Sequence, residues 1–251
     1  MESKTEAGIE ESVKMKQCYA FPRITTRGYY DLNTGEIKKT QPYYLYPKSK
    51  FDKISRGKEV VIFVHGMRNS RWGAIHGARL LRNKLRKLGY KYPIIAFSYD
   101  ADVRGAHLEK NYHKVLNTAG RIAYDNGSYN LSRFIQDLRI TNPSIKIHLV
   151  GHSLGCDVIS KIILPLGGTI HLFGSPVETK DVYKLCSFTT KLVNYYNPRD
   201  EVIREGVEKG VIKRPSCLYK VEDKLNDVST KNCYAKDHRF ASYVEKLRKF
   251  P

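Results

Sequence analysis

The chain has 251 residues, a length that suits one α/β domain better than two. Its 44 Lys and Arg against 25 Asp and Glu give a formal net charge of +19 and a pI near 9.6, and a hydrophobic fraction of 41% is sufficient for a single buried core. The charged, polar N-terminus is unlike a secretory signal peptide, and no apolar run approaches the ~18 residues of a membrane span, so a cytoplasmic location is expected.

The positive charge is spread along the whole chain and does not mark a detachable basic tail. Such a charge favours association with anionic surfaces such as lipid headgroups. No zinc-ligand spacing, arginine-rich run or RNA-binding aromatic signature accompanies it, so nucleic-acid binding is not expected. The five cysteines are scattered without CxxC spacing, so neither a complete disulfide set nor a metal site is expected, and nothing in the sequence specifies an oligomeric state.

The first 58 residues are predicted to precede the main domain. A polar leader covers residues 1–17, and a hairpin is expected to turn at Asn33-Thr34-Gly35. The Tyr-rich stretch QPYYLYPKSK, residues 41–50, is expected to be an extended surface segment.

From residue 59 to residue 251, short β-branched runs alternate with helical patterns. The predicted strands are EVVIFV at 59–64, PIIAFSYD at 93–100, IKIHLVG at 145–151, GTIHLFGSP at 168–176 and KLVNYYNP at 191–198, with CLYKVED at 217–223 as a last strand. Four helices are predicted. One ends at Gly89, two span residues 110–141 and 152–164, and the last covers residues 241–250. This alternation predicts a mainly parallel sheet with helices on both faces, whose reactive groups gather at the carboxyl ends of the strands.

A G-x-S-x-G motif follows the strand IKIHLV directly and opens a helix. It consists of Gly151, His152, Ser153, Leu154 and Gly155. A serine at so sharp a strand-to-helix turn projects its hydroxyl from the edge of the sheet, and the flanking glycines leave room for neighbouring strands. The motif therefore predicts Ser153 as a nucleophile.

A serine nucleophile needs a base and an acid. Of eight histidines, only His238 lies in a polar loop after the last strand and before the closing helix, and the order Ser, acid, His is typical of this kind of sheet. Asp200 follows the strand KLVNYYN and is the predicted acid, with Glu178 and the adjacent Glu201 as alternatives.

Two backbone N–H groups are expected to stabilise the oxyanion of the transition state. One belongs to Leu154, directly after the nucleophile. The other belongs to Met67, in the turn His65-Gly66-Met67 after the first core strand. Gly66 lets the chain turn sharply, and His65 is expected to brace the turn rather than to transfer protons.

With these motifs, the sequence over residues 59–250 resembles the α/β-hydrolase superfamily. VIFVHGMRNS and IHLVGHSLGCDVI are similar to the DUF900-type hydrolases, and FGSPVE followed by NPRDEV is similar to class 3 lipases. The resemblance implies an α/β-hydrolase fold, the same triad and oxyanion donors, hydrolysis of an ester or related acyl bond, and no metal or cofactor. The connection at residues 100–109 is short and charged, so no large lid domain is expected.

The function that these observations favour is a serine hydrolase, esterase-like or lipase-like, that cleaves carboxylic esters of small or medium acyl chains through an acyl-enzyme on Ser153. One alternative is a non-catalytic hydrolase-fold module that binds an anionic membrane or a protein partner. Another is a thioesterase, peptidase or acyltransferase that uses the same triad, because these reactions share the nucleophile machinery.

Overall fold

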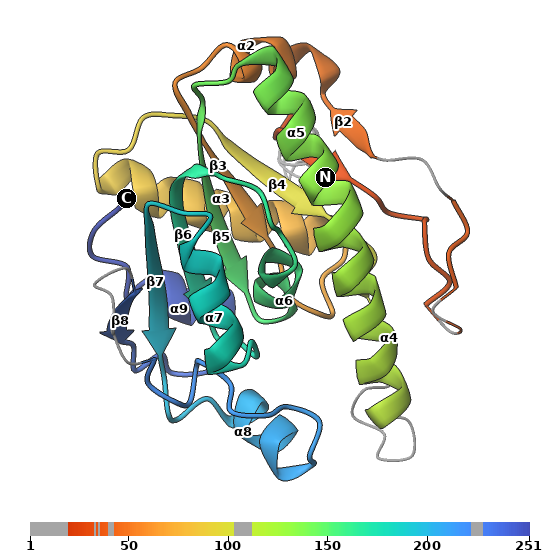
Figure 1. Cartoon of the computed structure of the whole chain (residues 1–251), viewed down its shortest axis with the longest axis vertical. Coiled ribbons are helices and arrows are strands. Elements are labelled where there is room, and N and C mark those ends of the chain that lie inside the picture. Colours follow the sequence, from red (N-terminus) through yellow and green to blue (C-terminus); the bar gives the residue numbers. More distant parts are fainter. Residues whose placement is uncertain (1–19, 33, 35, 40–42, 103–111, 222–227) are drawn as a thin grey trace, which may run out of the picture.

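The computed structural model describes residues 20–251 except 33, 35, 40–42, 103–111 and 222–227. The predicted leader at 1–17, the tip of the predicted hairpin and most of the connection at 100–109 lie outside these residues. The centre of the fold is an eight-stranded sheet in the order β2-β1-β4-β3-β5-β6-β7-β8 (Figure 1). The strands are β1 (Arg23–Thr25), β2 (Tyr44–Tyr46), β3 (Glu59–Val64), β4 (Ile94–Ser98), β5 (Lys146–His152), β6 (Gly167–Phe173), β7 (Lys191–Tyr196) and β8 (Val228–Asn232).

All neighbouring strands of this sheet are parallel except β2, which pairs antiparallel with β1. β3 lies between β4 and β5, and Val64 is in register with Phe97 on one side and with Gly151 on the other. The carboxyl ends of β3, β4 and β5 therefore meet at one edge, which brings the turn after β3 next to the turn after β5. The predicted parallel α/β sheet is confirmed.

Helices cover both faces of the sheet, with α3 and α9 behind it and α4 to α7 in front of it in the view of Figure 1. The α-helices are α2 (Phe51–Ser55), α3 (Arg71–Lys87), α4 (Tyr112–Asp125), α5 (Ser132–Thr141), α6 (Leu154–Ser160), α7 (Thr179–Cys186), α8 (Glu201–Glu208) and α9 (Phe240–Val244). A 3-10 turn, η1 (Lys48–Lys50), precedes α2, and a π-helix, η3 (Asn126–Leu131), joins α4 to α5 within the predicted helical region. No large lid is present in the described part of the chain.

The side chains of β3 explain the two-layered core. Alternate residues of a strand point to opposite faces of the sheet. Val60, Ile62 and Val64 accordingly pack with α4 to α7, whereas Val61 and Phe63 pack with α3 and α9. Both faces are apolar, which is why this strand is a continuous β-branched and aromatic run.

The prediction of a last strand at 217–223 is wrong for residues 217–221, and residues 222 and 223 lie outside the described part of the chain. The Cys217 carbonyl accepts from the Asn197 N–H, and the N–H groups of Leu218 and Tyr219 both donate to the Pro215 carbonyl, so this part of the chain turns across the end of β7. The edge of β7 is occupied instead by β8, whose sequence VSTKN is polar and partly exposed. Such an edge strand lacks the apolar pattern on which strand prediction depends.

The first 58 residues, predicted to precede the main domain, contribute two strands to the sheet. β1 pairs parallel with β4, and β2, which lies in the predicted extended segment, pairs with the outer edge of β1. The predicted hairpin is a short antiparallel contact, in which Tyr30 pairs with Ile37 and the Asp31 N–H donates to the Glu36 carbonyl.

Four of the described histidines, at 65, 148, 152 and 171, are buried with a lowered pKa, and they predict a pH-dependent stability. Burial lowers the pKa of His65, His152 and His171 from 6.5 to about 3 in each case. Between these values the unfolded chain binds protons that the folded chain does not, so the free energy of unfolding falls as the pH drops below about 6.5. The slope is at most about 1.4 kcal/mol per pH unit for each histidine.

Urea unfolding at pH 7.5 and at pH 5 measures this effect, and equal stability at the two values would contradict it. The variant His171→Leu removes one of the histidines that bind a proton on unfolding, so its stability should depend less steeply on pH than that of the wild type. His171 lies in β6 away from the predicted triad, which separates this measurement from any assay of activity.

None of the described helices combines the length and the apolar character that crossing a lipid bilayer requires. The described cysteines, at 156, 186, 217 and 233, are free thiols, and burial raises the pKa of Cys217 to about 12.

Candidate active site

Ser153 lies at the turn between β5 and α6 in a strained backbone conformation. Its φ of 53° and ψ of −126° fall in a region that side chains other than glycine rarely adopt. The Ser153 N–H donates to the Phe173 carbonyl of β6 over 2.9 Å, which holds the turn against the sheet. Ser153 is the N-cap of α6, but its hydroxyl makes no capping hydrogen bond and is free for another partner.

The glycines around Ser153 are required by close contacts. A Cβ on Gly155 would lie 2.1 Å from the Val64 carbonyl oxygen, because α6 begins directly against the end of β3. A Cβ on Gly151 would lie 2.8 Å from Ile159, and one on Gly66 would lie 2.8 Å from the Cβ of Ser153. The turn after β3 and the turn after β5 are therefore in contact.

Replacing Gly155 with alanine is expected to destabilise the protein by more than the ~1–3 kcal/mol typical of overpacking, because the new Cβ meets backbone that cannot move aside. Urea unfolding measures the change. Gly120→Ala in α4 is the matched control, since no atom lies within 4 Å of its added Cβ, and the better helix propensity of alanine should stabilise α4 by about 1 kcal/mol. Equal effects of the two substitutions would contradict the packing argument.

His238 and Asp200 lie beside Ser153, as the sequence predicts. His238 Nε2 is 2.8 Å from Ser153 Oγ, and His238 Nδ1 is 2.7 Å from Asp200 Oδ2 and 3.0 Å from Asp200 Oδ1. Since the carboxylate can only accept, Nδ1–H donates to Asp200 and Nε2 is left to accept the proton of the serine hydroxyl. The three groups form one continuous hydrogen-bonded chain that spans residues far apart in the sequence.

Asp200 is fully buried and held from several sides. It is the N-cap of α8, where Oδ1 accepts from the Ile203 N–H over 3.1 Å, and the Tyr243 hydroxyl of α9 donates to Oδ2 in a short hydrogen bond. Burial acts to raise the pKa of Asp200, but the hydrogen bond and charge of His238 and the other donors outweigh it, so the pKa lies below its ordinary value. The carboxylate is therefore ionised and its lone pairs are directed at fixed partners.

The histidines of the two turns act as supports. His152 Nε2 donates to the carbonyl of His238 over 2.7 Å, which fixes the backbone of the loop that carries the base. His65 stacks on Tyr99 at a ring-centroid distance of 4.4 Å, and its Nε2 accepts from the Tyr99 N–H while its Nδ1 donates to the Gly66 carbonyl. The sequence expectation that His65 braces its turn agrees with these contacts.

Two carbonyl groups of the turn after β3 are held by side chains of the same turn. The Gly66 carbonyl accepts from His65 Nδ1 and from Asn69 Nδ2, and the Met67 carbonyl also accepts from Asn69 Nδ2, at distances of 2.8, 3.1 and 3.2 Å. In a trans peptide the C=O and the following N–H point in opposite directions. The Met67 N–H therefore points away from the side chains of His65 and Asn69. Leu154, whose N–H is the other expected oxyanion donor, is the first residue of α6.

The alternative acids lie elsewhere. Glu178 is the N-cap residue of α7, and its side chain forms an ion pair with Lys180 over 2.8 Å. Glu201 is the exposed first residue of α8. The carboxylate that contacts His238 is that of Asp200.

Sequence reasoning missed three residues that support this constellation: Arg27, Asn69 and Tyr243. Asn69 has a local signal, because asparagine in a turn often bonds to nearby backbone groups. Tyr243 and Arg27 act across 43 and 42 positions of sequence, on Asp200 and Asn69 respectively, and no local pattern identifies such contacts.

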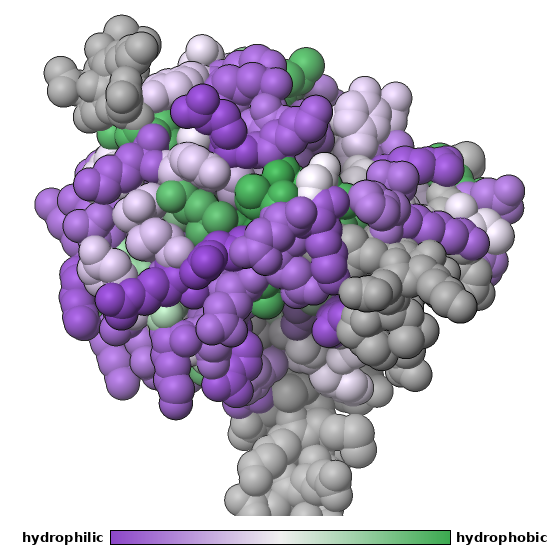
Figure 2. Space-filling view, turned by 90° about the horizontal axis from the view of Figure 1, so that it is seen from below, coloured by the Kyte–Doolittle hydropathy of each residue, from purple (hydrophilic) through white to green (hydrophobic). Residues whose placement is uncertain are grey.

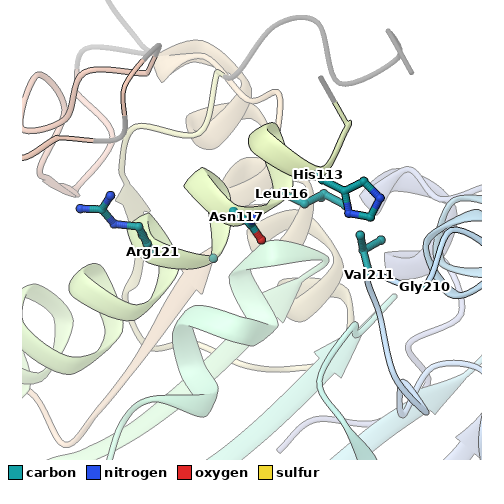
Figure 3. Close-up of a pocket in the computed structure, with 7 residues that line it drawn as sticks. His113, Leu116, Asn117, Arg121, Gly210 and Val211 are labelled. Carbon is teal, nitrogen blue, oxygen red and sulfur yellow. The ribbon is translucent and has the colours of Figure 1, made fainter. Parts of the chain in front are cut away.

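The end of the molecule that carries this constellation is shown in Figure 2. Its surface is mostly hydrophilic, with apolar residues gathered in a small central area. A cleft of about 600 Å³ lies between α4 and the turn after α8, and Figure 3 shows His113 and Val211 facing each other across it, while Arg121 points to the other side. Neither Ser153 nor His238 lines this cleft, so it is adjacent to α8 rather than centred on the nucleophile.

The comparisons with known proteins agree with this architecture. A family model described as an α/β hydrolase of unknown function, DUF900, matches residues 48–169, which include the turn after β3 and the turn around Ser153. No curated protein matches the sequence. The match covers just under half of the chain, and together with the strand order it supports an α/β-hydrolase fold.

One similar solved structure is that of Trichoderma reesei cutinase in complex with a C11Y4 phosphonate inhibitor. It is 12% identical, and the alignment covers 73% of this chain and 67% of that chain with a TM-score of 0.26. At that score the likeness has no weight for the fold or the substrate.

Proposed function

We propose that the protein is a serine esterase that cleaves carboxylic esters through an acyl-enzyme on Ser153. The observation that carries this proposal is the hydrogen-bonded chain from Asp200 through His238 to the hydroxyl of Ser153, which ends at a strained turn between a parallel strand and a helix. A buried aspartate, an imidazole with Nδ1 protonated and a serine without a capping bond are the three parts that nucleophilic acyl transfer requires.

In this mechanism His238 Nε2 takes the proton of the Ser153 hydroxyl as the oxygen attacks the ester carbonyl carbon. The protonated imidazole is stabilised by Asp200 and gives the proton to the leaving alkoxide, which departs as the alcohol. Water then attacks the acyl-enzyme, with His238 again acting as the base, and the carboxylic acid is released.

The oxyanion of each tetrahedral intermediate would be stabilised by the N–H groups of Leu154 and Met67. Support for Met67 comes from the fixed carbonyl of Gly66, which turns the next N–H away from His65 and Asn69, and from the contact of Gly66 with Ser153. In other serine hydrolases one such donor contributes a factor of about 10²–10³ to kcat.

Hydrolysis of p-nitrophenyl esters from acetate to palmitate tests the proposal. A turnover that reaches its maximum at short or medium acyl chains is the expected result, because no large lid is present in the described part of the chain to form an extended apolar site. A maximum at palmitate would instead favour a lipase. Turnover of thioesters or amides that exceeds turnover of every ester in the panel would show that the same triad serves another leaving group.

Labelling with a fluorophosphonate probe gives a second readout that does not depend on the acyl chain. The probe should modify the wild-type protein at Ser153 and leave the other serines unlabelled. A protein that hydrolyses no ester and takes up no probe would be a non-catalytic module, and the proposal would be wrong.

A further inference from the structure

Arg27 reaches from the segment before the family match to the turn that carries Met67. It lies just after β1, and its guanidinium group is half-buried at the carboxyl edge of the sheet. Nε donates to Ser98 Oγ over 2.7 Å, and Nη2 donates to the Asn69 carbonyl over 2.6 Å and lies 3.5 Å from His65 Nε2. One side chain thus connects β1, the end of β4 and the turn after β3.

The backbone around Arg27 is itself fixed. The nearly buried carboxylate of Asp100 accepts from the N–H groups of Gly28, Tyr29 and Tyr30 at distances between 2.8 and 3.2 Å. Three donors on one carboxylate hold the loop that follows β1 in a single conformation. Arg27 therefore bonds to the turn from a rigid base.

The turn that Arg27 contacts is strained and requires support. Arg68 has a φ of 60°, a conformation that is costly for a residue with a long side chain. Asn69 holds the carbonyls of Gly66 and Met67 with its side chain, and Arg27 in turn holds the carbonyl of Asn69. Without the guanidinium group, the Asn69 carbonyl loses its hydrogen bond to Arg27, and the Gly66 carbonyl is anchored to the sheet mainly through His65. The peptide between Gly66 and Met67 then gains freedom to rotate.

We propose that Arg27 is a positioning residue for the oxyanion site, which it orders through Asn69 without touching the substrate. This inference rests on the proposed function and adds that the segment before residues 48–169, the range that the family model matches, helps to order the oxyanion site. The fork of the guanidinium group reaches Ser98 and Asn69 at the same time, which a lysine ammonium group at the end of a flexible chain does not reproduce.

Arg27→Ala and Arg27→Lys test the proposal, with Lys50→Ala as the matched control. Lys50 belongs to the same N-terminal part of the chain and also donates to a backbone carbonyl, that of Ala20. It directly precedes α2, which lies at the end of the sheet opposite to α8 in Figure 1. We expect kcat for an ester to fall about tenfold to a hundredfold in Arg27→Ala and by a smaller factor in Arg27→Lys, with KM little changed. Lys50→Ala should retain wild-type turnover.

The decisive measurement is the ratio of turnover for an ester to turnover for its thionoester, in which sulfur replaces the carbonyl oxygen. An ordered oxyanion site favours oxygen, because sulfur is larger and accepts hydrogen bonds weakly. The ratio should therefore fall in Arg27→Ala by about the same factor as kcat. If Arg27 only stabilised the fold, the amount of active protein would fall while the ratio stayed at the wild-type value, and the proposal would be overturned.

Amide hydrogen exchange provides a readout that needs no substrate. Peptides that contain Met67 and Arg68 should exchange faster in Arg27→Ala than in the wild type or in Lys50→Ala. Unchanged exchange would show that Arg27 does not order the turn, even if the wild-type protein proved inactive on every ester. Faster exchange in Arg27→Ala, combined with a wild type that cleaves no ester, would show that Arg27 orders the turn but would reject the proposed function.

Discussion

Replacing Ser153 with alanine is expected to lower kcat on any ester that the protein cleaves by about a million-fold, the size of effect found when the nucleophile of a catalytic triad is removed. The reason is that the Ser153 hydroxyl is the group that His238 Nε2 contacts at 2.8 Å. Alanine leaves the base and the acid in place but provides no atom that can form the acyl-enzyme. The measurement is steady-state hydrolysis with stopped-flow detection of any burst.

Stability should be almost unchanged in Ser153→Ala. The Ser153 side chain makes no capping bond to α6, and alanine occupies the same strained backbone with a similar cost. Ser160→Ala is the matched control for the loss of a serine hydroxyl, and it should retain wild-type turnover. Ser160 is the last residue of α6, and its hydroxyl donates to the Asp157 carbonyl. Residual activity in Ser153→Ala above about one thousandth of the wild type would identify another nucleophile.

Asp200→Asn should lower kcat by about 10⁴, as the corresponding change does in a well-studied triad. Asparagine keeps the shape and can still cap α8 by accepting from Ile203, because asparagine is as good an N-cap as aspartate. Its amide group, however, donates where the carboxylate accepts. His238 Nδ1 must then accept this hydrogen bond, so the imidazole proton lies on Nε2. In this tautomer Nε2 cannot take the proton from Ser153.

The control for this prediction is Glu178→Gln, which removes the rival acid and should leave kcat unchanged because the Glu178 side chain pairs with Lys180. Thermal unfolding of both variants would show whether the fold is intact. A large loss in Glu178→Gln together with a small loss in Asp200→Asn would reverse the assignment of the acid.

The central strands and the turn that carries Ser153 could be predicted from the sequence because their signals are local. β3, β5 and β6 are buried on both faces, so most of their residues are apolar. The position of Ser153 follows from glycines at fixed distances, whose absence of side chains is required by contacts under 3 Å. His238 and Asp200 could be predicted because each follows a strand at the same edge of the sheet.

The parts that sequence could not predict depend on long-range contacts or on weak patterns. β1 and β2 are three residues long each, and β8 is polar, so none has the apolar periodicity of a core strand. CLYKVED has the composition of a strand but turns away because its backbone groups bond to Asn197 and to Pro215. The support that Arg27 gives to Asn69 depends on the pairing of β1 with β4, which no local pattern specifies.

The order of these parts along the chain determines when the proposed activity can first arise during synthesis. Ser153 precedes β6, β7 and β8, whereas His238 and Tyr243 follow all eight strands. Because domains are translated from the N-terminus and fold as units, a nascent chain that ends at β7 has the serine but no base to activate it. We expect such a chain to be inert toward acyl compounds, so that nucleophilic power appears only when the segment after β8 docks onto a finished sheet.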